Sequence, residues 1–445
     1  MAQTVAAPQL WGGVECTINR VGELFFDQYA WAGHREHLEA DLERIAGLGV
    51  QALRVGLHWE HFAATGSWES SDRMLNKLRE LEIRPIAGLL HHGSGPPGVS
   101  LMDEQFAEGL AEYARKVAER YPWLMDYTPV NEPQTTARFS GLYGHWYPHH
   151  RSMESYARAL VNEIKGVTLA MQAIRSIQPK ARLIHTEDGG VTHSTAELVG
   201  YREEREQRRW LGTDLLCGRV DEGHPMLDFL TLHGVRRDDV LWFQENSCPP
   251  DVLGLNYYVT SDRFLDHRTE LYPPYSAGGD SGTEPLVDIE AVRVWDGDLA
   301  GVETILLEAW QRYGLPVAIT EAHLGGPQED QVRWLAEVWA GAQAACQAGV
   351  DVQAVTVWAL LGLWNWSNLC TQDARSYEPG VFNSPTGELG ETALVKIVQG
   401  MARGESPRPK EGQGWWRRRD RFAYPIYPAY VPEESPMEMV AAVGR

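Results

Sequence analysis

The stretch Tyr127-Thr128-Pro129-Val130-Asn131-Glu132-Pro133 has the form of a short buried strand that ends in a carboxylate. The run over residues 126–130 is mostly apolar, as a buried strand is, and Pro133 prevents further strand pairing. A carboxylate in this position is costly unless it faces a cavity or has partners, and such an acid can lend and recover a proton. The alternative is an ordinary strand end whose Asn and Glu cap the following helix.

A second stretch, Leu315-Pro316-Val317-Ala318-Ile319-Thr320-Glu321, repeats this pattern. It is entered through Gly314 and also ends in a carboxylate. Because the two acids lie far apart in the sequence, only a closed fold would bring them together. Hydrolysis of a glycosidic bond uses such a pair, in which one acid protonates the leaving oxygen and one carboxylate acts at the anomeric carbon.

Short apolar runs alternate with helical patterns along the chain. The strand-like runs are residues 9–14, 51–57, 83–90, 126–130, 181–185, 251–255, 316–320 and 353–358. The helical patterns are residues 35–48, 71–82, 104–120, 152–177, 302–313 and 331–348. This alternation predicts an α/β fold with parallel strands, and eight units predict a closed (β/α)8 TIM barrel. A doubly wound sheet would alternate in the same way, but no G-x-G-x-x-G follows the first strand.

Polar residues end almost every predicted strand, which is typical of a barrel enzyme because the chemistry lies on that rim. They are Glu15, His58, His91, Asn131 with Glu132, Glu187 with Asp188, Asn256, Glu321 and Trp358. We therefore expect one barrel over residues 1–405 and an extended C-terminal tail, packed on the barrel, over residues 406–445. Residues 257–299, rich in Gly, Pro, Asp and Tyr, are expected to form a long loop over the rim.

Composition excludes several classes of function. The net charge of −21 argues against nucleic-acid and anionic-membrane partners. The five cysteines show no C-x-x-C spacing and suit free thiols in a reducing compartment. Neither a signal peptide nor an apolar run of about 20 residues is found, so we expect a cytoplasmic protein. The 17 Trp and 17 Tyr suit a site that stacks sugar rings, although core packing also explains many of them.

With these motifs in order, the chain resembles glycoside hydrolase family 1, the retaining β-glycosidases, from about Trp11 to Phe382. The first stretch resembles the family's acid/base motif, which implies that Glu132 is the general acid/base and that Asn131 binds the sugar's 2-hydroxyl. Ile319-Thr320-Glu321 resembles the nucleophile motif, although Ala322-His323 stands where the family has Asn-Gly.

The resemblance also implies several supporting residues. Arg54 matches an arginine that hydrogen-bonds the nucleophile, and Tyr258, in the motif Leu255-Asn256-Tyr257-Tyr258, would orient it. The other matching substrate-binding or supporting positions are His91, Asn256, Trp358 and Trp366.

Besides Ala322-His323, three positions depart from the family pattern. His92 replaces a Trp, Asn365 replaces a Glu that grips the 4- and 6-hydroxyls, and Asn19 replaces a Gln that reaches the same side. These departures imply a glycone altered at C4 or C6. They also leave open a non-catalytic sugar-binding protein or regulatory domain, and the sequence does not separate a hydrolase from a transglycosidase.

Other assignments have ordinary structural alternatives. Arg54 would otherwise form an ion pair at the bottom of the barrel, and His91 would be a core histidine. Glu187 and Asp188 either support the site or cap a helix. A metal site built from His91, His92 and Glu187 lacks a supporting spacing, so we predict no metal and no cofactor. Residues 143–150 are expected near the aglycone side, with surface histidines as the alternative.

The sequence therefore predicts a retaining β-glycosidase acting on a carbohydrate β-glycoside. Glu321 would attack the anomeric carbon while Glu132 protonates the leaving oxygen and later activates water. Their carboxyl groups should lie about 5–5.5 Å apart. Glu132 should hold its proton at neutral pH, partly because of the charge on Glu321. The oligomeric state is not indicated.

Overall fold

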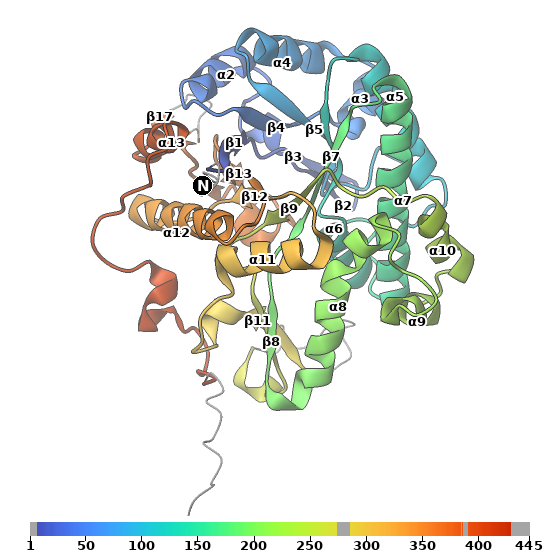
Figure 1. Ribbon diagram of the computed structural model, residues 1–445, viewed down its shortest axis with the longest axis vertical. Helices are drawn as coiled ribbons and strands as arrows, with labels where there is room; N and C mark the ends of the chain where they lie inside the picture. The colour runs from blue at the N-terminus through green and yellow to red at the C-terminus, as the bar shows by residue number, and fades with distance from the viewer. Residues whose placement is uncertain (1–6, 274–284, 384, 386–389, 429–445) are drawn as a thin grey trace, which may run out of the picture.

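The computed structural model describes residues 7–273, 285–383, 385 and 390–428. Eight parallel strands close into a barrel in the order β1-β13-β12-β9-β7-β6-β5-β4 (Figure 1). All eight strand-like runs are barrel strands, so the predicted TIM barrel is confirmed. The strands are β1 (Gln9–Gly13), β4 (Ala52–Gly56), β5 (Arg84–His91), β6 (Asp126–Asn131), β7 (Arg182–Asp188), β9 (Val252–Asn256), β12 (Val317–Ala322) and β13 (Val352–Val357).

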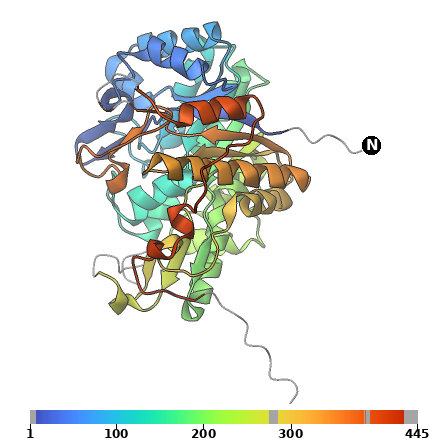
Figure 2. The ribbon, with the colours of Figure 1, turned by 90° about the vertical axis from the view of Figure 1, so that its left-hand side faces the viewer.

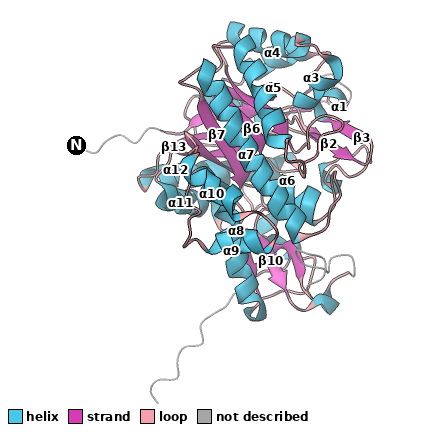
Figure 3. Ribbon diagram, turned by 90° about the vertical axis from the view of Figure 1, so that its right-hand side faces the viewer, coloured by secondary structure: helices cyan, strands magenta, loops and turns pink. Residues whose placement is uncertain are grey.

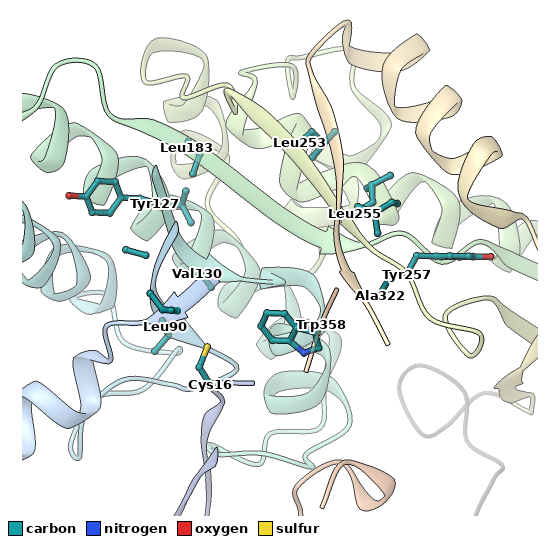
Figure 4. Packing of buried hydrophobic residues seen from close by; sticks show 14 of the residues in the cluster. Cys16, Leu90, Tyr127, Val130, Leu183, Leu253, Leu255, Tyr257, Ala322 and Trp358 are labelled. Carbon is teal, nitrogen blue, oxygen red and sulfur yellow. The ribbon is translucent and has the colours of Figure 1, made fainter. Parts of the chain in front are cut away.

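The barrel strands are buried on both faces, which explains why they read as nearly continuous apolar runs. Every residue of β6 and of β12 is buried. A separate layer of side chains from seven strands forms its own cluster, as in a packed barrel interior: Trp11, Ala52, Ile86, Ile184, Val252, Ala318 and Ala354. Leu183, Leu253 and Leu255 belong instead to the main core, which includes residues of the surrounding helices (Figure 4).

Helices surround the sheet on its outer face (Figure 3). The predicted helices are confirmed as α2 (Leu38–Ala46), α4 (Glu69–Glu80), α5 (Phe106–Arg120), α7 (Met153–Ile177), α11 (Gly301–Tyr313) and α12 (Gln328–Gln347). Further helices are α1 (Gln28–Trp31), α3 (Trp59–Thr65), α6 (Pro133–Ala137), α8 (Val199–Leu216), α9 (Pro225–Leu232), α10 (Arg237–Glu245) and α13 (Leu394–Ala402). None of the helices in the described part of the chain has the length and apolar character needed to cross a bilayer.

The prediction of a plain loop over residues 257–299 is wrong. Within it, β10 (Arg263–Asp266) pairs with β11 (Val287–Glu290) and with β8 (Thr192–Ser194), forming a three-stranded sheet (Figures 1 and 3). The strands are short, and one partner comes from a distant segment, so the local sequence pattern does not predict these strands. Residues 274–284 of the predicted loop lie outside the described residues.

Short hairpins complete the rim of the barrel. The strands β2 (Ile18–Val21) and β3 (Leu24–Asp27) pair with each other, as do β14 (Leu363–Trp364) with β15 (Tyr377–Glu378) and β16 (Phe382–Asn383) with β17 (Gly390–Glu391). All five cysteines are free thiols, and all but Cys217 are buried.

The described part of the C-terminal segment runs along the outside of the barrel from α13 towards the three-stranded sheet (Figure 2). Trp416 is buried, lies edge-on to Trp334 and donates a hydrogen bond from Nε1 to Glu337. Tyr427 forms an isolated bridge with Trp295. Residues 429–445 of the predicted tail lie outside the described residues, and the division of the chain at residue 405 stays a prediction.

Candidate active site

A cavity of about 1330 Å³ lies where the carboxyl ends of the barrel strands meet. Glu132 and Glu321 both line it, so the closed barrel brings together the two acids that the sequence singled out. Of the other predicted site residues, His92, Tyr258 and Trp366 also line the cavity.

Glu132 follows β6 and begins the turn into α6. Its backbone is left-handed, with a φ of 45°, and its side chain makes no capping hydrogen bond to α6. The side chain is only 6% exposed and accepts a hydrogen bond of 2.6 Å from Asn256 Nδ2. Burial, with the charges of Glu321 and Asp188 added, raises the pKa of Glu132 well above its usual range. These surroundings favour the protonated form of the carboxyl group.

Glu321 lies near the end of β12 in a more polar setting. Oε1 accepts a hydrogen bond of 2.8 Å from Arg54 Nη1, and Oε2 accepts one of 2.6 Å from the Tyr258 hydroxyl. Burial raises the pKa of Glu321, whereas Arg54 and Tyr258 act to lower it. A guanidinium and a phenol that donate to the two oxygens favour the anion and fix its orientation.

Arg54 belongs to this site rather than to the bottom of the barrel. It lies in the middle of β4, and its Nη2 donates to Asn131 Oδ1 at 2.6 Å while its Nη1 binds Glu321. Arg84 and Arg182 instead form ion pairs with a different buried carboxylate, Asp126. The guanidinium of Arg54 thus links the strand that carries Glu132 to the strand that carries Glu321.

Asn256 lies between the two acids. Its Nδ2 donates to Glu132, its Oδ1 accepts from Thr320 Oγ1 at 2.7 Å, and its amide acts to lower the pKa of Glu321 as well as that of Glu132. Because Thr320 precedes Glu321, this contact ties β9 to β12 at the level of the site.

His91, the last residue of β5, and His92, which follows it, differ in position. His91 stacks on Trp358 with ring centroids 5.4 Å apart, and its ring nitrogens contact Cys16 and Asn131. It does not contribute to the lining of the cavity in the described structure. His92 lines the cavity, with Nε2 3.8 Å from Glu132. Burial lowers the pKa of both rings, to about 3 for His92, so both are neutral.

Asn19 and Asn365 hold a loop at the rim and do not line the cavity. Asn365 Oδ1 accepts from the backbone N–H groups of Ala374 and Ser376, and its Nδ2 donates to Asp373. Asn19 Nδ2 donates to the carbonyl of Cys370 in the same loop. Both amides are therefore engaged in shaping residues 365–376.

Glu187 and Asp188, at the end of β7, have different surroundings. Glu187 Oε2 accepts from the backbone N–H of Gln134 at 3.3 Å, which stabilises the first turn of α6. Asp188 lines the cavity, and its charge raises the pKa of Glu132. Among the described residues, no group of three or more His, Cys, Asp or Glu side chains is arranged to hold a metal ion.

Several cavity residues were not assigned to the site from the sequence. Glu15, which follows β1, lines the cavity and was noted only as a polar strand end. His323 and Glu378 also line it, and Glu378 lies on the two-residue strand β15, for which the sequence carries no signal. From residues 143–150, Tyr143 and His145 line the cavity, as predicted for that segment's position near the site.

The chain is similar in sequence to curated β-glycosidases. It is 24% identical over 363 residues to β-glucosidase A of Thermotoga maritima, covering 75% of this chain and 79% of that protein. It is 23% identical over 367 residues to the bifunctional β-D-glucosidase/β-D-fucosidase of Bifidobacterium breve, covering 74% of this chain and 79% of that protein. No protein-family model matches the chain.

The fold is similar to solved structures of β-glucosidase from Thermotoga maritima. The family 1 β-glucosidase structure superposes with a TM-score of 0.71 and the complex with deoxynojirimycin with a TM-score of 0.70. Each is 18% identical and covers 91% of this chain and 99% of the other. The chain is thus a distant relative of these β-glucosidases in sequence and shares the barrel fold of the family 1 β-glucosidase.

Proposed function

We propose that this protein is a retaining β-glycosidase that hydrolyses a carbohydrate β-glycoside by double displacement. The observation that carries the proposal is the contrast between two buried carboxyl groups in one cavity. Glu321 receives hydrogen bonds from a guanidinium and a phenol, while burial and the neighbouring anions keep the proton on Glu132. Two acids whose surroundings separate their protonation states have the roles of nucleophile and general acid.

In the first step, the Glu321 carboxylate forms a bond to the anomeric carbon as the glycosidic C–O bond breaks. Glu132 gives its proton to the leaving oxygen, so the aglycone departs as a neutral alcohol. Formation of the glycosyl ester removes the negative charge of Glu321. Because that charge helps to raise the pKa of Glu132, the pKa of Glu132 falls and its carboxylate is ready to accept a proton.

In the second step, the Glu132 carboxylate takes a proton from water as the water oxygen attacks the anomeric carbon. The ester bond to Glu321 breaks, and both residues return to their starting states. An attacking sugar hydroxyl in place of water would make the same chemistry a transglycosylation. The predicted carboxyl separation of about 5–5.5 Å belongs to this proposal, since inverting enzymes need roughly 6.5–9.5 Å.

The proposal is tested with the variant Glu321→Ala. Turnover of aryl β-glycosides should be abolished, and external azide should restore it with a glycosyl azide of inverted anomeric configuration. A non-catalytic sugar-binding protein predicts no turnover by the wild type and no rescue. If Glu321→Ala turned over the aryl β-glycosides at the wild-type rate, the role given to Glu321 would be overturned.

We also propose an altered glycone specificity. The amide of Asn365 and the Nδ2 of Asn19 are engaged by loop residues, and neither side chain offers the charged acceptor that the family pattern has at position 365. Losing a charge-assisted hydrogen bond corresponds to roughly a 10- to 100-fold loss in kcat/KM for a glucoside. An aryl β-fucoside, which lacks the 6-hydroxyl, should be turned over at least as well as the β-glucoside. A glucoside preferred tenfold or more over the fucoside and the galactoside would contradict this.

A further inference from the structure

A third carboxylate of the cavity has no role in the double displacement. Glu15 follows β1, is 4% exposed and lines the same cavity as Glu132 and Glu321. The same cavity is lined by Trp366, Ser367 and Leu369 of the loop over residues 365–376. Burial, with the charge of Glu15 added, raises the pKa of the Cys370 thiol in this loop.

The hydrogen-bonding capacity of Glu15 is only partly used by the protein. Oε1 accepts from the backbone N–H of Thr17 at 2.9 Å, and Oε2 accepts from Trp358 Nε1 at 3.1 Å. An ionised carboxylate offers about four acceptor positions. The ion pairs of the described residues include none to Glu15, whereas Glu321 has Arg54. Burial, together with the charge on Glu321, raises the pKa of Glu15 to about 7. A buried acceptor without a counter-ion is costly unless further donors reach it.

Anchoring of Trp358 does not account for Glu15. The indole of Trp358 packs directly against Gly13, where an added Cβ would lie 2.1 Å from the ring. Its other contacts include the stacked ring of His91 and the guanidinium of Arg54, 4.8 Å from the ring centroid. These contacts hold the indole in place without the hydrogen bond to Glu15.

The loop that Glu15 faces supplies no amide to the cavity. Both polar atoms of Asn365 are used within the loop, and the Nδ2 of Asn19 donates to the carbonyl of Cys370. On this side of the cavity, the carboxylates that remain as charged acceptors for a sugar hydroxyl are therefore Glu15 and Glu378, and Glu15 is the more deeply buried of the two.

We propose that Glu15 is a specificity-determining residue whose carboxylate accepts a hydrogen bond from a hydroxyl group of the glycone. This inference rests on the proposed function, because it requires the glycone to occupy this cavity. It implies a glycone that is neutral or cationic where it meets β1. A glycone with a phosphate or carboxylate at that position would be repelled.

The test combines the variant Glu15→Gln with a set of aryl β-glycosides that each lack one glycone hydroxyl. Glutamine keeps the size of the side chain, and its single carbonyl oxygen can still accept from Trp358. The N–H of Thr17 then loses its acceptor, which affects every substrate alike. On the fully hydroxylated substrate, Glu15→Gln should lower kcat/KM roughly 10- to 100-fold. On the one deoxy substrate that lacks the contacted hydroxyl, the loss caused by Glu15→Gln should be at least tenfold smaller than on the fully hydroxylated substrate.

Trp358→Phe is the matched control, since it removes the indole N–H that Glu15 accepts. If Glu15 served only to hold Trp358, Glu15→Gln would lower kcat/KM by the same factor for all substrates. The losses from Glu15→Gln and Trp358→Phe would then not add in the variant that carries both substitutions. That result, or the absence of any loss in Glu15→Gln, would overturn the inference. Should Glu15→Gln fail to fold, Glu15→Asp keeps the charge, and its loss should disappear on the same deoxy substrate.

Failure of the proposed function gives a different outcome. If the wild type turns over none of the glycosides, the glycosidase proposal fails, and the role of Glu15 is decided by calorimetric binding of glucose and its deoxy analogues. Weaker glucose binding in Glu15→Gln, with no change for one deoxy sugar, would still support a sugar-binding Glu15. Equal binding of every sugar would refute it.

Discussion

Glu132 and Glu321 carry the same carboxyl group, and their neighbours make them different acids. Glu321 accepts hydrogen bonds from two strong donors, Arg54 and Tyr258. Glu132 has the amide of Asn256 and a neutral His92 near it, and the anions Glu321 and Asp188 act on it. At the scale of single residues, the assignment of roles therefore depends on contacts made by residues from other strands.

The first prediction concerns the pKa of Glu132. Burial makes the largest contribution to the raised pKa of Glu132, and the charge of Glu321 makes the next largest. Glu321→Gln should therefore lower this pKa but leave it above the usual value near 4.5. Asp188→Asn should lower it less, because the effect of Asp188 is smaller than that of Glu321. Carbon-13 NMR titration of Glu132 measures both shifts. An unchanged pKa in Glu321→Gln would show that the two carboxyl groups do not interact.

The second prediction concerns the leaving group. Glu132→Ala should lower kcat/KM by about 10²–10⁴ for aglycones that are poor leaving groups, because these need protonation. For substrates with activated aryl aglycones, the rate of the glycosylation step should fall little. Rates measured over a series of aryl glycosides would therefore depend more steeply on the aglycone pKa in the variant. An equal loss for every aglycone would argue that Glu132 is not the acid.

At the scale of elements, sequence periodicity is enough for the barrel and not for its rim. The eight strands and six of the helices follow apolar patterns that are set by burial against neighbours on both faces. The three-stranded sheet of β8, β10 and β11 depends on pairing between distant short segments, which local composition does not reveal. Residues of that sheet, including Arg263 and Asp288, line the cavity, so part of the site was hidden for the same reason.

The site residues divide in the same way. Glu132, Glu321 and Arg54 lie in strand motifs, so the sequence could predict them as site residues. The barrel places both acids in the cavity wall and Arg54 on Glu321. Glu15 stood at a predicted strand end, but its place in the cavity wall, beside Trp358 from the other end of the chain, appears only in the folded barrel. The loop contacts of Asn365 are likewise a property of the folded rim, and a residue match alone does not show that the amide is already engaged.

The third prediction concerns α7 and stability. Glu163 on this helix is fully buried, and neither of its carboxyl oxygens has a hydrogen-bond partner in the described structure. Burial and the charge of Glu187 raise its pKa well above the usual range. The folded state therefore binds a proton that the unfolded state releases once the pH exceeds about 4.5, so stability falls as the pH rises above that value towards the folded pKa.

Glu163→Met should remove this penalty. The variant should be more stable than the wild type by about 1–3 kcal/mol near pH 8, with a smaller difference near pH 5, as measured by urea unfolding. Glu104→Gln, at an exposed position ahead of α5, is the control and should change stability by less than about 0.5 kcal/mol. A variant that is less stable than the wild type at both pH values would contradict the account of Glu163.

At the scale of the whole molecule, the C-terminal segment joins the barrel to the rim sheet. Trp416 packs on α12 through Trp334 and Glu337, while Tyr427 contacts Phe264 of β10. Trp415 and Tyr424 of the same segment line the cavity. The segment therefore contributes both to packing and to the walls of the site.

The fourth prediction follows from this packing. Trp416→Ala should lower the free energy of unfolding by about 3–5 kcal/mol, as expected for a buried Trp. Trp416→Phe, which keeps the ring contact with Trp334 and loses the hydrogen bond to Glu337, should cost about 0.5–1.5 kcal/mol or slightly more. Urea unfolding of both variants checks the order. Equal stability of Trp416→Ala and the wild type would mean that the segment is not held on the barrel in solution.

The central claim, a covalent glycosyl-enzyme on Glu321, is tested most directly by trapping that intermediate. The wild type is treated with an activated 2-deoxy-2-fluoro-β-glycoside of the glycone it turns over best, and the digested protein is analysed by mass spectrometry. The account predicts a fluoroglycosyl ester on the peptide that contains Glu321, with none formed in Glu321→Ala. An ester on a different residue, or hydrolysis with inversion of configuration at the anomeric carbon and no covalent adduct, would contradict it.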